Sequence, residues 1–452
     1  MQSDAQPNLL TAGSLWRGLT ALAWPMFVSA ILQNVQGLID LFWVGRLGSN
    51  AVAAIALSTT ILMILFPVVM GLCVGTVAFV ARSVGAGQLE EANDAAGQSL
   101  LVALVCGLLA GVPGWLLSAK LCRLLGAAPE VVRLGSDYLQ VSFLGSFTVF
   151  LLFTGNSILQ GAGNAVVPMV VMLIANLLNL VLDPIFIFGW LGGPAMGVRG
   201  AALATVLAQS MAAAIVLLKL HRGVAGLRVT PSRWRFNFGL TLRIVKVGLP
   251  SAGQMFARSL MSLVLMRIVA ACGTAAVAAY GIGLRFHAII LFPTFAIGNA
   301  AATMVGQSLG AGLPQRAVRA AWLATAAALA LIAATAAALM ALAPQMIRVF
   351  DASAPVVAVG SAYLRIVSPF YLFAALGIVL SRAQMGAGDT MAPMLCTLIS
   401  LWGIQVPLAL VLSRTVAPAT TGIWWAVAVA LVANGLLSVA WFQAGRWQHQ
   451  RL

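Results

Sequence analysis

The sequence predicts an all-α integral membrane protein with twelve transmembrane helices in two six-helix lobes. Its 452 residues are 62% hydrophobic and only 8% charged, and the mean hydropathy is +1.02. A soluble domain of this size needs more charge to cover its surface. Twelve apolar runs are each long enough to cross a hydrocarbon core of about 30 Å. Finally, the second half of the chain repeats the first.

The apolar runs are taken in order as membrane spans, because each is long and contains few charges. The first begins after a mixed polar segment and continues as a full span, so we expect no cleavable signal peptide. The expected spans are 17–44, 51–80, 93–119, 131–158, 166–190, 199–220, 242–271, 276–304, 317–345, 355–381, 391–413 and 421–444.

The repeat has a constant offset of 225 residues, which carries Pro25 onto Pro250. The same offset superimposes Gly-Ala-Gly turns at 85–87 and 161–163 on those at 310–312 and 386–388. Each repeat has six spans, so both begin on the same side of the membrane. We therefore expect parallel repeats related by a pseudo-two-fold axis along the membrane normal, an arrangement typical of alternating-access transporters.

Charge placement predicts the domains and the orientation. Residues 221–241 form the long polar connection between an N-terminal lobe, 1–220, and a C-terminal lobe, 242–452. With both termini in the cytoplasm, 14 Lys and Arg residues fall on the inner side and 7 on the outer side, as the positive-inside rule requires. The net charge of +15 is therefore attributed to cytoplasmic loops, and we expect no nucleic-acid partner.

Other functional classes lack their residues. The five cysteines are scattered without a CxxC pair, and only three histidines occur, which argues against a disulfide framework and a metalloenzyme. No G-x-x-x-x-G-K-[ST] sequence is present, so ATP is not the expected energy source. We expect a protein that is not an enzyme and that needs no cofactor.

Two spans of the first lobe carry matched polar stripes. In each, two amides and one aspartate follow the spacing i, i+3, i+7 and so share one helical face. The fourth and sixth spans add further polar side chains in the same lobe. The residues are Gln33, Gln36 and Asp40 in span 1, Asn176, Asn179 and Asp183 in span 5, Asn156 and Gln160 in span 4, and Thr205 and Gln209 in span 6.

The aspartates do not repeat, since Asp40 falls on Leu265 and Asp183 on Leu408. Ionisable residues inside a membrane are costly and usually functional. A carboxylate in a poorly hydrated pocket binds a proton more readily, and a neighbouring carboxylate strengthens this effect. The pair is therefore expected to hold H⁺, or Na⁺ with amide oxygens. The alternative is a purely structural set of interhelical hydrogen bonds.

Three further features concern substrate and motion. Pro25 removes a helical hydrogen bond in span 1 and is a candidate hinge, although proline kinks are often static. Arg258 and Arg285 are cations within the second lobe, and Phe286 lies beside Arg285. With Gln36 and Asn176 they are candidates for lining a substrate cleft between the lobes, although an aromatic stripe is more often packing.

The chain resembles the multidrug and toxic compound extrusion (MATE) family. The resemblance covers nearly the whole chain. It rests on the paired six-span repeats, the paired Gly-Ala-Gly turns, the span 1 run 33–45 (QNVQGLIDLFWVG), the turn 160–164 (QGAGN) and the span 5 run 179–184 (NLVLDP).

Within the family, the chain looks most similar to the DinF-like prokaryotic branch. That resemblance implies that a polar cluster in the first lobe carries cation coupling. The matching positions are Asp40, Asn156, Asn179 and Asp183, with Gln33 nearby and Thr205 completing the set. The NorM-like branch uses acidic residues in the second lobe, where this chain has none within its spans; Arg258 stands near one such position.

The resulting hypothesis is a monomeric antiporter of the bacterial inner membrane. It would exchange a cation, H⁺ favoured over Na⁺, for amphipathic and often cationic compounds, in contact with membrane lipid. A second hypothesis is a flippase for lipid-linked saccharides or other lipids, in which Arg258 and Arg285 hold diphosphate. An integral membrane enzyme is disfavoured because no reactive cluster is found, and a structural or receptor-like protein is disfavoured by the polar stripes.

Overall fold

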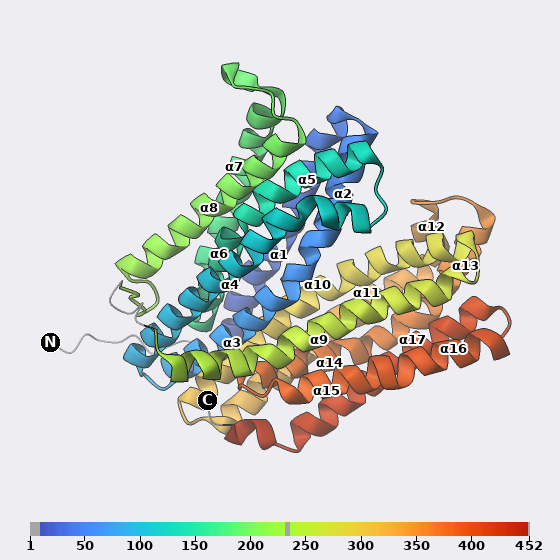
Figure 1. Ribbon diagram of the computed structural model, residues 1–452. Coiled ribbons are helices and arrows are strands. Elements are labelled where there is room, and N and C mark those ends of the chain that lie inside the picture. The colour runs from blue at the N-terminus through green and yellow to red at the C-terminus, as the bar shows by residue number, and fades with distance from the viewer. Residues whose placement is uncertain (1–9, 231–235, 451–452) are drawn as a thin grey trace. The chain divides into compact units, whose positions relative to one another are not determined.

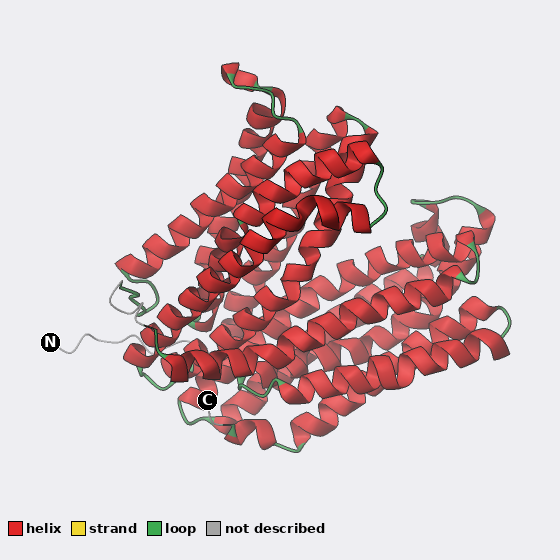
Figure 2. Cartoon of the chain, viewed as in Figure 1, coloured by secondary structure: helices red, strands yellow, loops and turns green. Residues whose placement is uncertain are grey.

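The computed structural model describes residues 10–230 and 236–450, and these are helical almost throughout (Figures 1 and 2). Apart from one isolated bridge between Val224 and Leu227, the described residues contain no β-structure. An all-helical architecture follows from the apolar composition, since a helix satisfies its own backbone hydrogen bonds within a bilayer.

The described residues of the first half form eight α-helices and three short 3₁₀ segments (Figure 1). They are α1 (Leu15–Val44), η1 (Gly45–Leu47), α2 (Ser49–Leu62), η2 (Met63–Leu65), α3 (Phe66–Gly85), α4 (Leu89–Leu124), α5 (Pro129–Leu144), α6 (Ser146–Gly161), α7 (Val166–Phe188), η3 (Trp190–Gly192) and α8 (Val198–Arg222).

The second half repeats this order with different breaks. Its elements are α9 (Phe238–Ala270), α10 (Thr274–Gly310), α11 (Pro314–Ala341), α12 (Ala343–Arg348), α13 (Ala354–Val367), η5 (Ser368–Phe370), α14 (Tyr371–Gly386), α15 (Met391–Leu398), the π-helix η6 (Ile399–Gln405), α16 (Val406–Thr415), α17 (Ala419–Gln443) and η7 (Arg446–His449).

The expected spans are present in order. Eleven continuous helical segments of the described chain are long and apolar enough to cross a membrane. The twelfth is the pair α5 and α6, bent by 49° where Gly145 lies between the two helices. The sequence predicted this span at 131–158 but not its bend. The prediction of twelve spans is confirmed when the bent pair is counted as one.

Four glycines show the repeat in the backbone. Gly87, Gly163, Gly312 and Gly388 follow the ends of α3, α6, α10 and α14 with φ between +71° and +95°. Glycine adopts this left-handed conformation without the steric cost that a side chain brings, and it commonly ends helices in this way. The expectation that the Gly-Ala-Gly sequences form tight turns is therefore confirmed.

The tertiary contacts divide the chain into two compact units. Unit 2 comprises Trp24–Leu249, and unit 1 comprises the described residues up to Ala23 together with those from Pro250 onward. The boundaries thus fall inside α1 and α9, next to Pro25 and Pro250, rather than in the connection 221–241. The lobe boundaries drawn from the sequence remain a prediction, and residues 231–235 of that connection lie outside the described part.

Segments between helices are held by side-chain hydrogen bonds within each unit. In unit 2, Asn93 Oδ1 accepts from the backbone N–H of Arg228 at 2.8 Å, and Gln98 Oε1 accepts from that of Asn237 at 2.9 Å. In unit 1, the Arg316 guanidinium donates to the carbonyl oxygens of Leu10 and Gly13 at 3.0 and 2.5 Å. The first pair of contacts holds the α8–α9 connection against α4, and the second holds the segment before α1 against α11.

Candidate functional site

The two intramembrane aspartates are joined by a chain of polar contacts in unit 2. Asn179 Nδ2 donates to Asp183 Oδ1 at 3.2 Å and lies 3.4 Å from Thr205 Oγ1. Thr205 Oγ1 in turn lies 3.4 Å from both carboxylate oxygens of Asp40. Side chains from α1, α7 and α8 therefore form one continuous cluster, which we call the Asp40–Asp183 cluster (Asp40, Thr205, Asn179 and Asp183).

Close packing of α7 on α8 brings these side chains together. Asn179 and Asp183 are one turn apart and so share a face of α7. Gly200 allows α8 to approach, since a Cβ at this position would collide with the backbone of Phe186. One turn later, Thr205 Oγ1 also bonds the Ala201 carbonyl at 3.0 Å, which fixes its rotamer.

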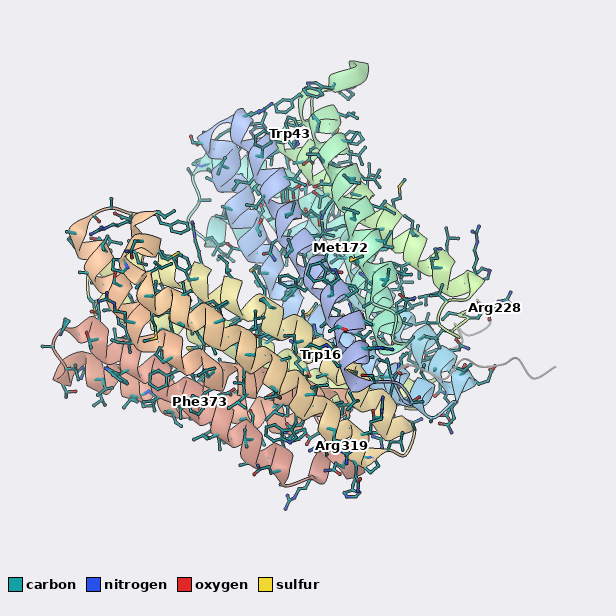
Figure 3. The ribbon with its side chains drawn as sticks, turned by 180° about the vertical axis from the view of Figure 1, so that it is seen from behind. Trp16, Trp43, Met172, Arg228, Arg319 and Phe373 are labelled. Atoms are coloured by element: carbon teal, nitrogen blue, oxygen red, sulfur yellow. The ribbon has the colours of Figure 1, made fainter. Side chains whose placement is uncertain are left out.

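The residues that follow the two aspartates along α1 and α7 belong to an apolar core. Ile187 follows Asp183 by one turn of α7, and Val44 follows Asp40 by one turn of α1. Both belong to one buried core, the Val44 core, in which Trp43 (labelled in Figure 3) and Phe188 are also packed. The other buried members of this core are Ala51, Ile55, Tyr138, Val198, Ala201 and Ala202. Residues 41–44 of α1 and 184–188 of α7, which lie between each aspartate and the end of its helix, are all apolar.

A cavity of about 560 Å³ reaches one end of the cluster. Asp40 and Thr205 line it, whereas Asn179 and Asp183 are fully buried and do not. The remaining wall is largely apolar, with Phe66, Phe150 and Phe153 among its residues. Such a cavity suits an amphipathic molecule, because it offers a large apolar surface and few polar groups.

Several oxygen atoms in this region have no hydrogen-bond partner within the described chain. They are Asp183 Oδ2, Asn179 Oδ1, Asn176 Oδ1 and Asn156 Oδ1, and all four are buried. Buried acceptors are normally satisfied, so unpaired ones at a site require a chemical explanation. A proton on Asp183 would convert one of its oxygens into a donor, and a bound Na⁺ would be coordinated by carboxylate and amide oxygens.

The structure brings together only part of the predicted coupling set. Asp40, Thr205, Asn179 and Asp183 form the cluster, and Gln33 lies on the cavity wall beside Asp40. Asn156 is buried in α6 and carries one of the unpaired oxygens.

The candidate substrate residues divide between the two units. In unit 2, Gln36 lines the cavity, its Nε2 unpaired within the described chain, and Asn176 Nδ2 donates to the Leu32 carbonyl at 2.7 Å. In unit 1, Phe286 is buried and packs edge-on against the Phe350 ring, with 5.7 Å between their centroids. Arg285 is exposed and lies 5.7 Å over the same ring, while Arg258 is half-buried in α9.

Sequence reasoning missed four polar residues of the cavity wall, namely Thr59, Tyr138, Ser142 and Ser146. Tyr138 and Ser142 lie one turn apart on α5. A signal was available for Tyr138, because the repeat aligns it with Tyr363. In unit 1 that tyrosine lies 3.4 Å from the Tyr371 hydroxyl, which lies 3.2 Å from His287 Nδ1. His287 thus belongs to a chain of polar contacts with these two tyrosines.

Comparison with known proteins places these features in a family. The MatE family model matches residues 25–185 and 250–411, so its two copies begin at Pro25 and Pro250. A probable multidrug resistance protein NorM of Thermotoga maritima is 27% identical over 437 residues, covering 95% of this chain and 92% of the relative. Another NorM, from Rhodopseudomonas palustris, is 31% identical over 442 residues, with 95% and 90% covered.

Solved structures agree with the sequence comparison. A MATE protein solved in the bent conformation has a TM-score of 0.89 and 26% sequence identity, and 96% of each chain is covered. The family model matches more than half of the chain, and the relatives span nearly all of it. The chain therefore belongs to the MatE family of multi-pass membrane transporters.

Proposed function

We propose that the protein is a secondary active multidrug efflux transporter. It exchanges a cation for amphipathic, often cationic compounds by alternating access, in the bacterial inner membrane. The observation that carries this proposal is the contact chain from Asp40 through Thr205 and Asn179 to Asp183. The multidrug resistance names of its relatives support the same substrate class.

The cavity supports a link between cation and substrate. Asp40 belongs both to the cluster and to the cavity wall, so a molecule in the cavity and an ion on Asp40 share one neighbourhood. Coupling requires that ion and substrate favour different conformational states. Protonation of the cluster would bias the outward-open state toward substrate release. Pro25, fifteen residues before Asp40 in the same helix, is the proposed hinge.

We favour H⁺ as the coupling ion and keep Na⁺ as the second candidate. The cluster is small, and its neutral members, Thr205 and Asn179, are hydrogen-bonding groups suited to a carboxyl that gains and loses a proton. The unpaired oxygens of Asp183 and Asn179 are the observation that favours Na⁺. Coupling in the first repeat also favours the DinF-like branch of the family. We further propose a monomer with both termini in the cytoplasm.

The flippase hypothesis depended on Arg258 and Arg285 acting as a pair that binds diphosphate. The guanidinium of Arg285 instead lies over the Phe350 ring, and Arg258 is half-buried within α9. Neither observation favours a diphosphate site, so we retain efflux as the proposed function.

The test is transport in liposomes free of Na⁺. The purified protein is reconstituted, luminal pH is followed with a trapped indicator, and a cationic dye is added. We expect dye-evoked proton movement in the wild type and none in Asp40→Asn or Asp183→Asn. Asp351→Asn is the matched control, since it makes the same change in a connecting segment of unit 1.

Each result has a defined meaning. Dye transport that begins only after Na⁺ is supplied, with no movement of protons, would assign Na⁺ as the coupling ion. Full efflux in both Asp40→Asn and Asp183→Asn would show that the cluster has no coupling role. Silence with either ion would return the flippase hypothesis to first place.

A further inference from the structure

Asn176 was expected to contact substrate, but its contacts in the structure indicate another role. It is buried in α7, it is absent from the wall of the 560 Å³ cavity, and its Nδ2 donates to the Leu32 carbonyl at 2.7 Å. This hydrogen bond joins α7 to the backbone of α1. Leu32 lies seven residues after Pro25 and eight before Asp40. We propose that Asn176 is a positioning residue that holds α1 against α7 and so sets the place of Asp40 in the cluster.

The second repeat contains an equivalent hydrogen bond. At the offset of 225 residues Leu32 corresponds to Ala257, and the Ala257 carbonyl accepts from Trp402 Nε1 at 3.1 Å. Asn176 corresponds to Leu401, so the donor has moved by one residue. The donor helix is a π-helix there, Ile399–Gln405. The same backbone acceptor is thus held by the equivalent helix in both repeats, through different side chains, which indicates that the attachment point itself matters.

The helices whose carbonyls accept these hydrogen bonds, α1 and α9, are the least buried of the continuous spans in the described chain. The most apolar window of the span starting at Leu15 is 17% buried and that of α9 is 22%, against 28–61% in the other continuous spans of the described chain. Both helices contain a proline, which removes a backbone hydrogen bond. A loosely packed helix depends more on each specific contact, so a single buried hydrogen bond has a large share in fixing α1.

The second repeat contains a further hydrogen bond, which joins α9 to α15. Gln254, buried on α9 four residues after Pro250, donates to the Pro393 carbonyl at 2.9 Å and lies 2.7 Å from Thr397 Oγ1. Its equivalent in the first repeat is Ser29, whose hydroxyl bonds the Pro25 carbonyl of its own helix at 2.8 Å. Among the described side chains, Asn176 therefore performs in unit 2 what Gln254 and Trp402 share in unit 1.

This inference rests on the proposed function in one respect, namely that Asp40 binds the coupling cation. Loss of the Asn176 bond leaves every member of the cluster present but releases the helix that carries Asp40. We therefore expect Asn176→Leu to shift the pH profile of dye efflux for all substrates alike. The apparent affinity for the coupling cation should fall about three- to tenfold, the range for one net hydrogen bond.

Two controls isolate the effect. Asn34→Leu makes the same change on α1 itself, where the exposed Asn34 amide bonds the Ala30 carbonyl of its own helix at 2.8 Å. Trp402→Phe removes the equivalent bond in unit 1, which carries no aspartate in its spans. Neither control should move the pH profile. Asn176→Ala also removes the donor and serves if the leucine variant yields little folded protein.

A second readout does not depend on transport. A cysteine is introduced at Gly37, where a Cβ meets no atom within 4 Å and the residue lines the cavity. The background lacks the five native cysteines. We expect Asn176→Leu to change the maleimide labelling rate of Gly37→Cys about threefold or more, because α1 moves more freely, while Asn34→Leu leaves the rate unchanged.

The outcomes separate this inference from the proposed function. An unchanged labelling rate together with an unchanged pH profile overturns the role of Asn176, even if Asp40→Asn abolishes coupling. Altered preference among dyes at a fixed pH profile also overturns it and restores a substrate contact. A changed labelling rate supports the attachment of α1, even if Asp40→Asn retains full efflux and the proposed function fails.

Discussion

Thr205 is the residue that connects the two carboxylates across helices. Its hydroxyl lies 3.4 Å from each oxygen of Asp40 and 3.4 Å from the amide of Asn179, which bonds Asp183. Asp40 is reached from the cavity, whereas Asp183 is fully buried. The contacts that link Asp40 to Asp183 therefore run through the Thr205 hydroxyl and the Asn179 amide.

Replacing that hydroxyl tests the connection. Thr205→Val keeps the branched shape and removes the oxygen, so dye efflux should fall at least about tenfold, as expected for hydrogen bonds to a charged group. Thr205→Ser keeps the oxygen and should retain most of the activity. Efflux rates in proteoliposomes measure both. Equal activity in the valine and serine variants would show that the hydroxyl does not connect the aspartates.

The spacing of polar residues was enough to predict most of this site. Two stripes at i, i+3, i+7 identified Asp40, Asn179 and Asp183, because such a pattern is rare within apolar spans. The stripes did not reveal which members face the cavity and which face a neighbouring helix. Gln36 and Asn176 are amides of the two stripes. Gln36 lines the cavity, whereas Asn176 bonds the backbone of α1. That difference depends on the rotation of each helix, which spacing along one helix does not determine.

At the scale of elements, the contact of α7 with α8 determines whether the cluster exists. Gly200 lies against the backbone of Phe186, and an added Cβ would force the helices apart. Small residues at such crossings permit close packing of helices in membranes. The separation of these helices sets the distance from Thr205 to Asn179.

A single methyl group tests this packing. Gly200→Ala should destabilise the protein by about 1–3 kcal/mol through overpacking and should lower efflux, because Thr205 moves away from Asn179. Gly281→Ala is the matched control, since a Cβ there meets no heavy atom within 4 Å. The melting temperatures of the two variants are compared in detergent, with size-exclusion chromatography used to measure the folded fraction after heating. A melting temperature for Gly200→Ala no lower than that of Gly281→Ala would contradict the prediction.

Element boundaries were largely predictable, and the irregularities within elements were not. Long apolar runs located the spans, and the Gly-Ala-Gly sequences located turns with φ between +71° and +95°. The bend at Gly145 and the π-helix Ile399–Gln405 left no such mark. Both arise where side chains of neighbouring helices pack, as where Trp402 reaches the Ala257 carbonyl, and tertiary contacts of this kind override local propensity.

At the scale of the whole molecule, the repeated scaffold carries two different interiors. The positions of Leu62 and Ser146, which line the cavity in the first repeat, correspond to His287 and Tyr371 in the second. There the rings of Tyr280, Tyr363 and Trp424 pack against one another. One repeat thus encloses a cavity beside two carboxylates, while the equivalent positions of the other are occupied by packed aromatic rings.

Moving the carboxylates tests whether that interior matters. In a quadruple variant, Asp40→Leu and Asp183→Leu are combined with Leu265→Asp and Leu408→Asp. Efflux should remain absent, because the positions of Thr205 and Asn179 hold Ala430 and Ile404 in the second repeat. Proteoliposome efflux is measured on protein that elutes as a single folded species. Recovery of cation-coupled efflux would mean that the carboxylates suffice without their polar neighbours.

The boundary of the compact units has a consequence for how the halves can be made. The contacts assign residues up to Ala23 to the unit that otherwise begins at Pro250, and residues Phe238–Leu249 to the unit that ends there. Each half of the sequence therefore supplies the opening turns of a helix to the fold of the other half, an internal exchange of segments. A polypeptide cut between Arg222 and Phe238 would leave both fragments incomplete. Neither half of the described sequence therefore contains all the residues of one compact unit.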